Sequence, residues 1–304
     1  MKVLYVNAMD YGENAGVDAI AHGLAHGLAQ DGIEIGVIYA DFRNDNWRDL
    51  QSEAVERGVE AGVDGIVVYV LDPNNPAQAV ANAREEGIPV FTLERPRFDV
   101  DGCVVYPNFN HGVFMAEYLA TLVKPKARVA VIGGPDVVDD IELILGLLHG
   151  LENEGLEVIN DPFDPRYKNV SDVASGGYEK ATNVLADFDD IDALIPYNDE
   201  TMHGAQRALD EAGLLGSVVT VSRNGTPAAV EKVKAGTHAG TWDLDCPGIG
   251  MTVAELVRRQ LVEGEKLEGL CVASPIGRMI TPENAGRWVT WEERIPYDPL
   301  PVGV

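Results

Sequence analysis

Short β-branched runs recur about every 30 residues along this chain, and stretches with helical periodicity separate them. The runs 65–70 (GIVVYV) and 128–134 (RVAVIGG) are apolar at successive positions, which is typical of strands covered on both faces. Between two earlier runs, Ile20, Leu24 and Leu28 share one face of a helix. Strands that alternate with helices form right-handed βαβ units and a parallel sheet. The sequence therefore predicts an α/β fold made of doubly wound parallel sheets.

A break in this pattern near 105–112, where the sequence reads YPNFNHG, divides the chain into two halves, and its 304 residues suffice for two domains. The segment 245–304 is too short for a third domain. Within it, 248–267 is predicted to be a good amphipathic helix. The strands expected before the break are 3–8, 33–40, 65–70, 88–93 and 103–107, and those after it are 128–134, 156–160, 193–197, 218–222 and 238–244.

Several strand-like runs end abruptly in polar residues, which are Glu94, Arg95, Asn198, Asp199 and Asn224. In open parallel sheets ligands bind beyond the carboxyl ends of the strands, so these residues are candidates for one site. The charged pair offers strong directional hydrogen bonds, and each asparagine offers both a donor and an acceptor.

Aromatic residues near the same strands, Tyr69, Phe163 and Trp242, offer flat apolar faces. Polar residues at strand ends together with flat aromatic faces suit a small, neutral, polyhydroxylated ligand. A plainer interpretation of one tip is that Asp199 and Glu200 cap the helix after them.

Composition excludes one class of partner. The net charge is −26 and the sequence pI is about 4.4, whereas binding nucleic acid needs Lys and Arg to replace counterions. The three cysteines, Cys103, Cys246 and Cys271, allow at most one bridge, and we expect them to be small core or strand-end residues.

Motifs for catalysis, cofactors or metals are missing. The turn GGPD at 133–136 lacks the spacing of a phosphate-binding loop, and no nucleophile elbow is present. His22 and His26 have the spacing of metal ligands on a helix, but no third ligand follows and we expect both to face solvent. The acidic clusters at 139–142 and 187–192 lack an EF-hand register and are expected to be solvated. We therefore expect no catalytic residues, no cofactor and no metal site.

The order and spacing of TLERPR, YNDETMHGAQRAL, NGTPAAVEKVKAG and ITPEN resemble those of ribose-binding-type sugar receptors, the type I solute-binding proteins of ABC importers. The ligand-sensing domains of lactose-repressor-type regulators are similar. The resemblance extends to about residue 290 and implies two lobes joined by three crossovers, with the ligand between them. It implies an amino-terminal lobe of 1–107 plus 245–275 and a carboxyl-terminal lobe of 108–244 plus 276–304.

The resemblance also implies roles for single residues. Glu94 and Arg95 take the place of an Asp-Arg pair that grips sugar hydroxyls, Asn198 falls on the Asn of an Asn-Asp-Glu tip, and Asn224 replaces an aspartate before Gly-Thr. Phe163 fits an aromatic position of the carboxyl-terminal lobe. Further residues that fall near pocket positions of the family are Tyr69, Asn108, Tyr11, Trp242 and Asp243.

This chain departs from the family at three places. A family arginine before a Gly-aromatic pair falls on Leu145 or Leu147, and a pocket glutamine falls on Leu244. The family's loop after the first strand is replaced by 9–16, where Tyr11 or Glu13 stands in. These departures change the pattern of hydroxyl contacts, so we expect a less polar sugar, a polyol or a derivative rather than ribose itself.

The leading hypothesis is a monomeric sugar or polyol receptor that closes on its ligand and delivers it to the membrane permease of an ABC importer. The first residues read as a strand, so either the protein is cytoplasmic or a signal peptide has been removed; the resemblance favours a periplasmic or extracytoplasmic location. One alternative is a sensor domain of a lactose-repressor-type regulator or of a chemosensory system. Another is a carbohydrate-active enzyme that uses Glu94 with Asp199 or Asp243.

Overall fold

A computed structural model describes all residues from 1 to 304, and the chain divides into two compact units. Unit 1 comprises Met1–Tyr106, Asp245–Ile276 and Thr290–Val304, and unit 2 comprises Pro107–Leu244 and Gly277–Val289. The chain therefore passes from one unit to the other four times, once more than expected. No helix combines the length and the apolar character that crossing a membrane requires.

Unit 1 contains a six-stranded sheet in the order β11-β5-β4-β3-β1-β2, in which every neighbouring pair is parallel. Its strands are β1 (Lys2–Asn7), β2 (Glu34–Tyr39), β3 (Gly65–Tyr69), β4 (Val90–Leu93), β5 (Gly102–Val105) and β11 (Leu270–Ala273). Its helices are α1 (Ala15–Ala29), α2 (Trp47–Ala61), α3 (Ala77–Glu85), α9 (Cys246–Leu261) and α10 (Trp291–Arg294).

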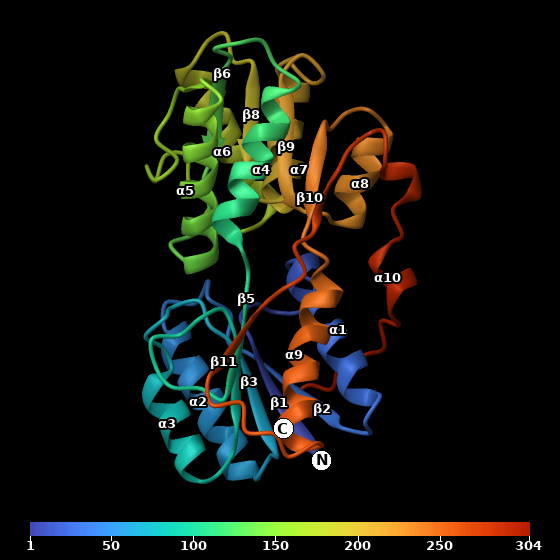
Figure 1. Cartoon of the computed structure of the whole chain (residues 1–304). Coiled ribbons are helices and arrows are strands. Elements are labelled where there is room, and N and C mark those ends of the chain that lie inside the picture. Colours follow the sequence, from blue (N-terminus) through green and yellow to red (C-terminus); the bar gives the residue numbers. More distant parts are fainter. The chain divides into compact units, whose positions relative to one another are not determined.

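Helices cover both faces of this sheet, with α2 and α3 together on one side and α1 and α9 together on the other (Figure 1). Alternate strand residues such as Val6, Ile66 and Val68 are fully buried against Val55 of α2 and Val80 of α3. Because the strands are apolar on both faces, each face needs its own layer of helices.

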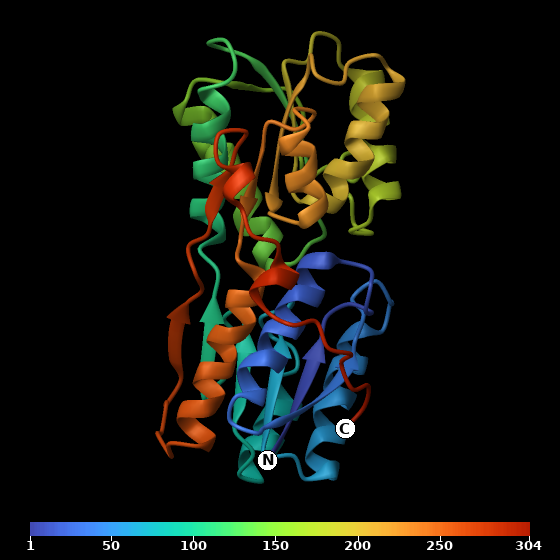
Figure 2. The same ribbon diagram turned by 90° about the vertical axis from the view of Figure 1, so that its right-hand side faces the viewer.

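The C-terminal tail corrects the expected lobe boundary. Residues 276–304 were assigned to the second lobe, but 290–304 belong to unit 1. The tail runs beside β2 (Figure 2), where the Val37 N–H donates to the Pro301 carbonyl at 2.9 Å and the Gly303 N–H donates to the Val37 carbonyl at 2.8 Å. The tail thus satisfies backbone groups on the edge of β2 that no other strand pairs.

Unit 2 repeats the architecture with the sheet order β12-β10-β9-β8-β6-β7, in which only β12 is antiparallel to its neighbour. Its strands are β6 (Arg128–Ile132), β7 (Glu157–Val158), β8 (Ala193–Pro196), β9 (Val219–Asn224), β10 (Gly240–Asp243) and β12 (Arg278–Ile280). Its helices are α4 (Asn108–Ala120), α5 (Val138–Asn153), α6 (Ala174–Asp187), α7 (Asp199–Glu211), α8 (Pro227–Lys234) and the 3-10 turn η1 (Ala285–Arg287).

Close helix pairs flank this second sheet, α4 with α5 and α6 with α7. Gly146 of α5 lies so close to α4 that a Cβ built on it would be 1.9 Å from the Phe109 carbonyl oxygen, so only glycine fits there. All ten expected strands are confirmed, whereas β11 and β12 were missed. Both are short and only partly buried, so neither shows the apolar run by which strands were recognised.

One disulfide joins Cys103 of β5 to Cys271 of β11, with the two Cα atoms 4.7 Å apart. The two residues are directly opposite each other in the parallel register of these strands. Cys246 is buried at the start of α9 and lies outside this disulfide. The sequence allows at most one bridge, and the structure forms it between Cys103 and Cys271, which both lie within strands of unit 1.

Candidate ligand-binding site

In unit 2, Asn198, Asn224 and Asp243 lie at the carboxyl ends of β8, β9 and β10. The three strands are neighbours in the parallel sheet, so these ends share one edge, and the register places Asn224 opposite Asp243. The strand-tip pattern thus identified residues that the fold gathers in one region.

Asn198 is buried and serves as the N-cap of α7, because its Oδ1 accepts a hydrogen bond from the Thr201 N–H at 2.9 Å. Its Nδ2 donates to the carboxylate of Asp172, which also accepts the hydroxyl of Tyr197. The alternative in which Asp199 and Glu200 cap this helix is wrong, since both lie within its first turn.

Asn224 has a φ of 125°, and its amide Nδ2 donates to Glu200 Oε2 at 3.1 Å. Burial raises the pKa of Glu200, and the negative charges of Asp172 and Asp199 raise it further. The Asn224 amide opposes that rise because it donates to the charged form of the carboxylate. Hydrogen-bond donors therefore accompany the carboxylates at this end of the sheet.

Arg223 precedes Asn224 and is 4% exposed, although the sequence analysis did not select it. Its Nη1 donates to Asn108 Oδ1 at 3.0 Å, and its Nη2 forms an ion pair with Asp140 Oδ1 at 3.0 Å. Asn108, the first residue of α4, is thereby connected to the end of β9. Asp139 and Asp140 are both buried whereas Glu142 is exposed, so the expectation that this acidic cluster is solvated is wrong for its two aspartates.

Trp242 is the third of the four residues of β10 and lies opposite Arg223 in the register of β9 and β10. Its ring is stacked on Phe114 and tilted against His111 of α4, with centroids 5.3 and 5.4 Å away, and its indole Nε1 is buried without a hydrogen-bond partner. Asp243 is buried and its Oδ2 accepts the indole N–H of Trp288 at 2.8 Å. Trp242 thus packs on the face covered by α4, and Asp243 anchors the segment that follows β12.

Phe163 lies in the irregular segment after β7 and is partly buried. It lines a narrow crevice at the end of β6 together with Gly134, Asp140 and Ile144. The structure therefore places Phe163 near the carboxylate that holds Arg223, within the same region of unit 2.

Asp199 is fully buried and already saturated with donors. Its oxygens accept the hydroxyls of Ser222 and Thr241 and the backbone N–H of Thr226. Burial raises its pKa to about 6, although these hydrogen bonds favour the charged form. Asp199 is a structural residue that ties α7 to β9 and β10, and it is not available to a substrate as the enzymatic alternative requires.

In unit 1, Glu94 directly follows β4 and has a φ of 67°, a left-handed conformation that turns the chain sharply. Its side chain is 3% exposed, whereas that of its neighbour Arg95 is exposed and lines a hollow of about 560 Å³ with Phe98 and Cys271. The two members of the predicted pair therefore face different surroundings.

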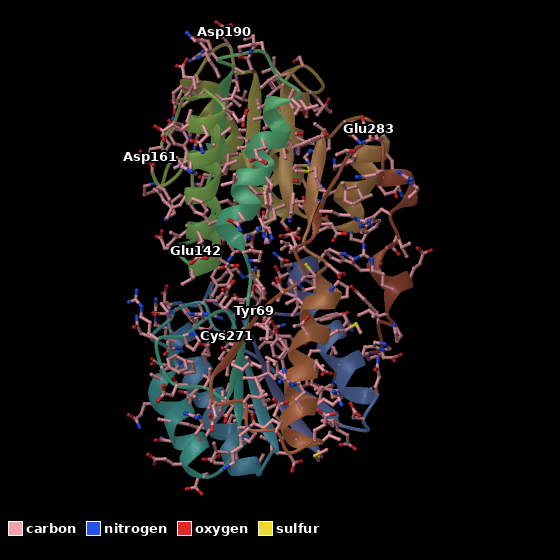
Figure 3. The ribbon with its side chains drawn as sticks, in the orientation of Figure 1. Tyr69, Glu142, Asp161, Asp190, Cys271 and Glu283 are labelled. Atoms are coloured by element: carbon pink, nitrogen blue, oxygen red, sulfur yellow. A yellow bond between two sulfur atoms is a disulfide. The ribbon has the colours of Figure 1, made fainter.

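Tyr69, which is labelled in Figure 3, is buried at the end of β3. Its ring meets that of Tyr106 edge to face, with centroids 6.4 Å apart. Tyr11 is 54% exposed, and its hydroxyl lies 3.1 Å from Nε2 of His22. His22 is buried and stacked on Tyr297, so the expectation that it faces solvent is wrong. The returning tail, which supplies Tyr297, covers this histidine.

Asn7 at the end of β1 is a further candidate that the sequence analysis missed. It is fully buried, and its Oδ1 accepts the backbone N–H of Ala8 at 2.8 Å. Its Nδ2 is buried without a hydrogen-bond partner, which is uncommon for a buried amide. Its position just after an apolar run is the signal that could have found it.

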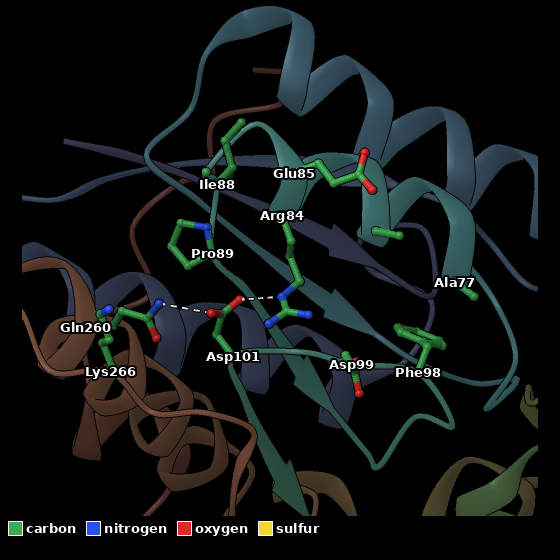
Figure 4. Close-up of a pocket in the computed structure, with 12 residues that line it drawn as sticks. Ala77, Arg84, Glu85, Ile88, Pro89, Phe98, Asp99, Asp101, Gln260 and Lys266 are labelled. Carbon is green, nitrogen blue, oxygen red and sulfur yellow. Dashed lines mark hydrogen bonds and ion pairs between the residues drawn. The ribbon is translucent and has the colours of Figure 1, made fainter.

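Another hollow of unit 1, of about 770 Å³, lies at the opposite end of the sheet (Figure 4). Asp101, which precedes β5, accepts Arg84 Nε and Gln260 Nε2 there, each at 3.1 Å. Pro89, which precedes β4, lines the same hollow. Because these residues lie at the amino ends of the strands, this hollow is separate from the strand tips described above.

Arg223 and Asp172 were not predicted as site residues, and they differ in how clearly the sequence around them marks their position. Arg223 follows an apolar run as clearly as Asn224 does, so the same pattern could have selected it. Asp172 lies in an irregular segment and has a positive φ, and nothing in the sequence relates it to Asn198.

Comparisons with known proteins agree with this architecture. A family model described as a periplasmic binding protein domain matches residues 6–266. The D-xylose-binding periplasmic protein of Escherichia coli K12 is 26% identical over 219 residues, which cover 68% of this chain and 64% of that protein. The ribose import binding protein RbsB of Bacillus subtilis 168 is 27% identical over 202 residues, which cover 65% of this chain and 62% of that protein. The chain thus matches less than two thirds of the length of these relatives.

Among solved structures, an ABC transporter solute-binding protein from Bacillus halodurans C-125, with bound myo-inositol, aligns with a TM-score of 0.79. It is 26% identical, and the alignment covers 94% of this chain and 96% of that protein. The similarity therefore extends over nearly the whole chain and includes both units.

Proposed function

The chain belongs to the periplasmic binding protein family, and from that premise we propose that it is a receptor for a neutral sugar or polyol that serves an ABC importer. The observation that carries the ligand class is the arrangement at the strand ends of unit 2. There Arg223 is paired with Asp140, and the carboxylates of Asp172 and Glu200 receive amide donors from Asn198 and Asn224. Relatives named for D-xylose and ribose and a structure with myo-inositol support a polyhydroxylated ligand.

The charges at this site favour a neutral ligand over an anionic one. Arg223 is a buried cation of this region and is already balanced by Asp140. The neighbouring Asp139 and Asp172 are acidic, so a sugar acid or a phosphate would be repelled in a medium of low dielectric constant. Neutral hydroxyls avoid that repulsion, because each hydroxyl can both donate to a carboxylate and accept from an amide.

The arrangement of ligand hydroxyl groups that this site recognises is expected to differ from the arrangement that a ribose receptor recognises. The arginine that the family resemblance places on α5 is replaced by Leu145, which is exposed, or Leu147, which is fully buried. In this chain a guanidinium comes instead from Arg223 on β9. A cation on β9 rather than on α5 reaches the ligand from another direction, so we propose a different sugar or a polyol as the preferred ligand.

Receptor action requires that the ligand engage groups from both units and bind more tightly when both are engaged. A ligand can shift a conformational equilibrium only through its different affinity for the two states. A shift from 1:99 to 99:1 needs about 5.5 kcal/mol, which a handful of charge-assisted hydrogen bonds can supply. We propose Glu94, Arg95 and Tyr69 as the contributors from unit 1.

The disulfide supports a location outside the cytoplasm, because such bonds persist mainly in oxidising compartments. We propose that the receptor acts there as a monomer, that its partner is the membrane permease of an importer, and that it neither binds nucleic acid nor acts as an enzyme.

The test is a thermal-unfolding screen of the purified protein against neutral pentoses, hexoses and polyols, with sugar acids, sugar phosphates and amino acids as matched controls. A ligand that binds the folded state raises the midpoint by an amount that grows with the logarithm of its concentration over Kd. We expect at least one neutral sugar or polyol to raise the midpoint and the anionic analogue of the same carbon skeleton to leave it unchanged. Stabilisation by the anionic analogue alone, or by an amino acid alone, would contradict the proposal.

A further inference from the structure

The edge strand β11 is the least securely held strand of unit 1. It has only β5 as a neighbour, and its residues are half-buried or exposed. Segments without helix or strand structure precede and follow it. Backbone hydrogen bonds from Gly269 to Asp101 and from Ser274 to Val105, each 2.9 Å, flank the strand. Few buried apolar contacts and an open edge are features of a segment with low local stability.

The disulfide fastens this strand at its centre. Cys271 is the second residue of β11, and its partner Cys103 is 2% exposed within β5, which is held by strands on both sides. Cys103 also belongs to the apolar core that α2 and α3 cover. The bond therefore connects a weakly held edge to the interior of the sheet (Figure 3).

Both bonded strands lead out of unit 1. The chain passes into unit 2 after Tyr106, just beyond β5, and again after Ile276, just beyond β11. The disulfide thus joins two of the segments that connect the units, shortly before each leaves unit 1. The other cysteine, Cys246, has no such bond and lies after a different passage of the chain.

We propose that the Cys103–Cys271 disulfide is a clasp that keeps β11 and its exit segment on the sheet and thereby supports ligand binding. Without the bond, β11 would open more often, and ligand binding would have to restore the order that the opening had removed, which lowers the affinity. The effect on affinity rests on the proposed receptor function. The effect on β11 does not.

The experiment compares the wild type, Cys103→Ala/Cys271→Ala and the control Cys246→Ala by amide hydrogen exchange in the absence of ligand. In the double variant we expect peptides covering 269–276 to exchange at least about tenfold faster, while β1 and β3 exchange as in the wild type. The control should show wild-type exchange throughout. Thiol titration in denaturant should find one free thiol in the wild type, two fewer than its cysteine count.

Calorimetric titration with the ligand selected by the thermal screen completes the test. We expect the double variant to bind about threefold to tenfold more weakly, and Cys246→Ala to bind as the wild type does. Unchanged exchange at 269–276 would overturn the clasp, and faster exchange with unchanged affinity would overturn its part in binding. If no ligand is found, the receptor proposal fails, and exchange at 269–276 still decides whether the strand is clasped.

Discussion

Replacing Arg223 with methionine tests whether the buried cluster at the end of β9 is held by charge. The substitution keeps most of the side-chain volume and removes the guanidinium that faces Asp140 and Asn108. The two side chains of the ion pair are only 5% and 9% exposed, so water cannot replace the lost partner. Leaving a buried charge without its counter-ion costs about 3–5 kcal/mol. We expect a loss of this size in the free energy of unfolding.

The double variant Arg223→Met/Asp140→Leu removes both charges, and we expect it to recover at least about 2 kcal/mol of that loss, because apolar residues can replace a buried ion pair at little cost. Arg207→Met is the matched control, since its ion pair with Glu211 is exposed and should contribute less than about 1 kcal/mol. Urea unfolding followed by circular dichroism measures the differences, and hydrogen exchange in β9 assigns them to unit 2. A single variant as stable as the wild type, or a double variant no more stable than the single one, would refute this reasoning.

Two further predictions concern unit 2. Gly146→Ala should destabilise by about 1–3 kcal/mol, since the new Cβ would lie 1.9 Å from the Phe109 carbonyl oxygen, whereas Gly286→Ala, with open space around it, should be nearly neutral in the same urea titration. Burial, together with the charges of His203 and Lys232, lowers the pKa of His238 to about 3. A histidine with a lowered folded-state pKa contributes stability above about pH 6.5 that is lost as the pH falls toward 3. His238→Gln should therefore gain stability relative to the wild type by about 1.4 kcal/mol per pH unit between pH 6 and 4. A difference that stays constant over this range would contradict that assignment.

Much of the fold could be predicted because strands covered on both faces leave long apolar runs. GIVVYV and RVAVIGG are examples, and each contains a strand at the expected place. The edge strand β11 could not be predicted in this way, because an edge strand needs few buried side chains. The return of 290–304 to unit 1 depends on backbone hydrogen bonds to β2, which leave no pattern in side-chain types.

The candidate site was predictable where chemistry coincides with a strand end, as at Asn198 and Asn224. It was not predictable where the partner is distant in sequence, as with Asp140, which pairs with Arg223 from another element. The place of Trp242 within β10 directs its ring to the face covered by α4, which is also the face on which Arg223 meets Asn108. Residue type and proximity to a strand end therefore do not determine which side of the sheet a side chain occupies.

The central claim is that one neutral polyhydroxylated ligand is gripped by groups from both units. Its most direct measurement is calorimetric titration of the ligand found by the thermal screen against the wild type, Arg95→Ala from unit 1 and Asn224→Ala from unit 2. We predict one bound molecule per chain and a loss of affinity of about tenfold or more in each variant, since a buried polar group left without its hydrogen-bond partner costs about 1–3 kcal/mol. Full affinity in either variant would contradict the account, because the ligand would then be held by one unit alone.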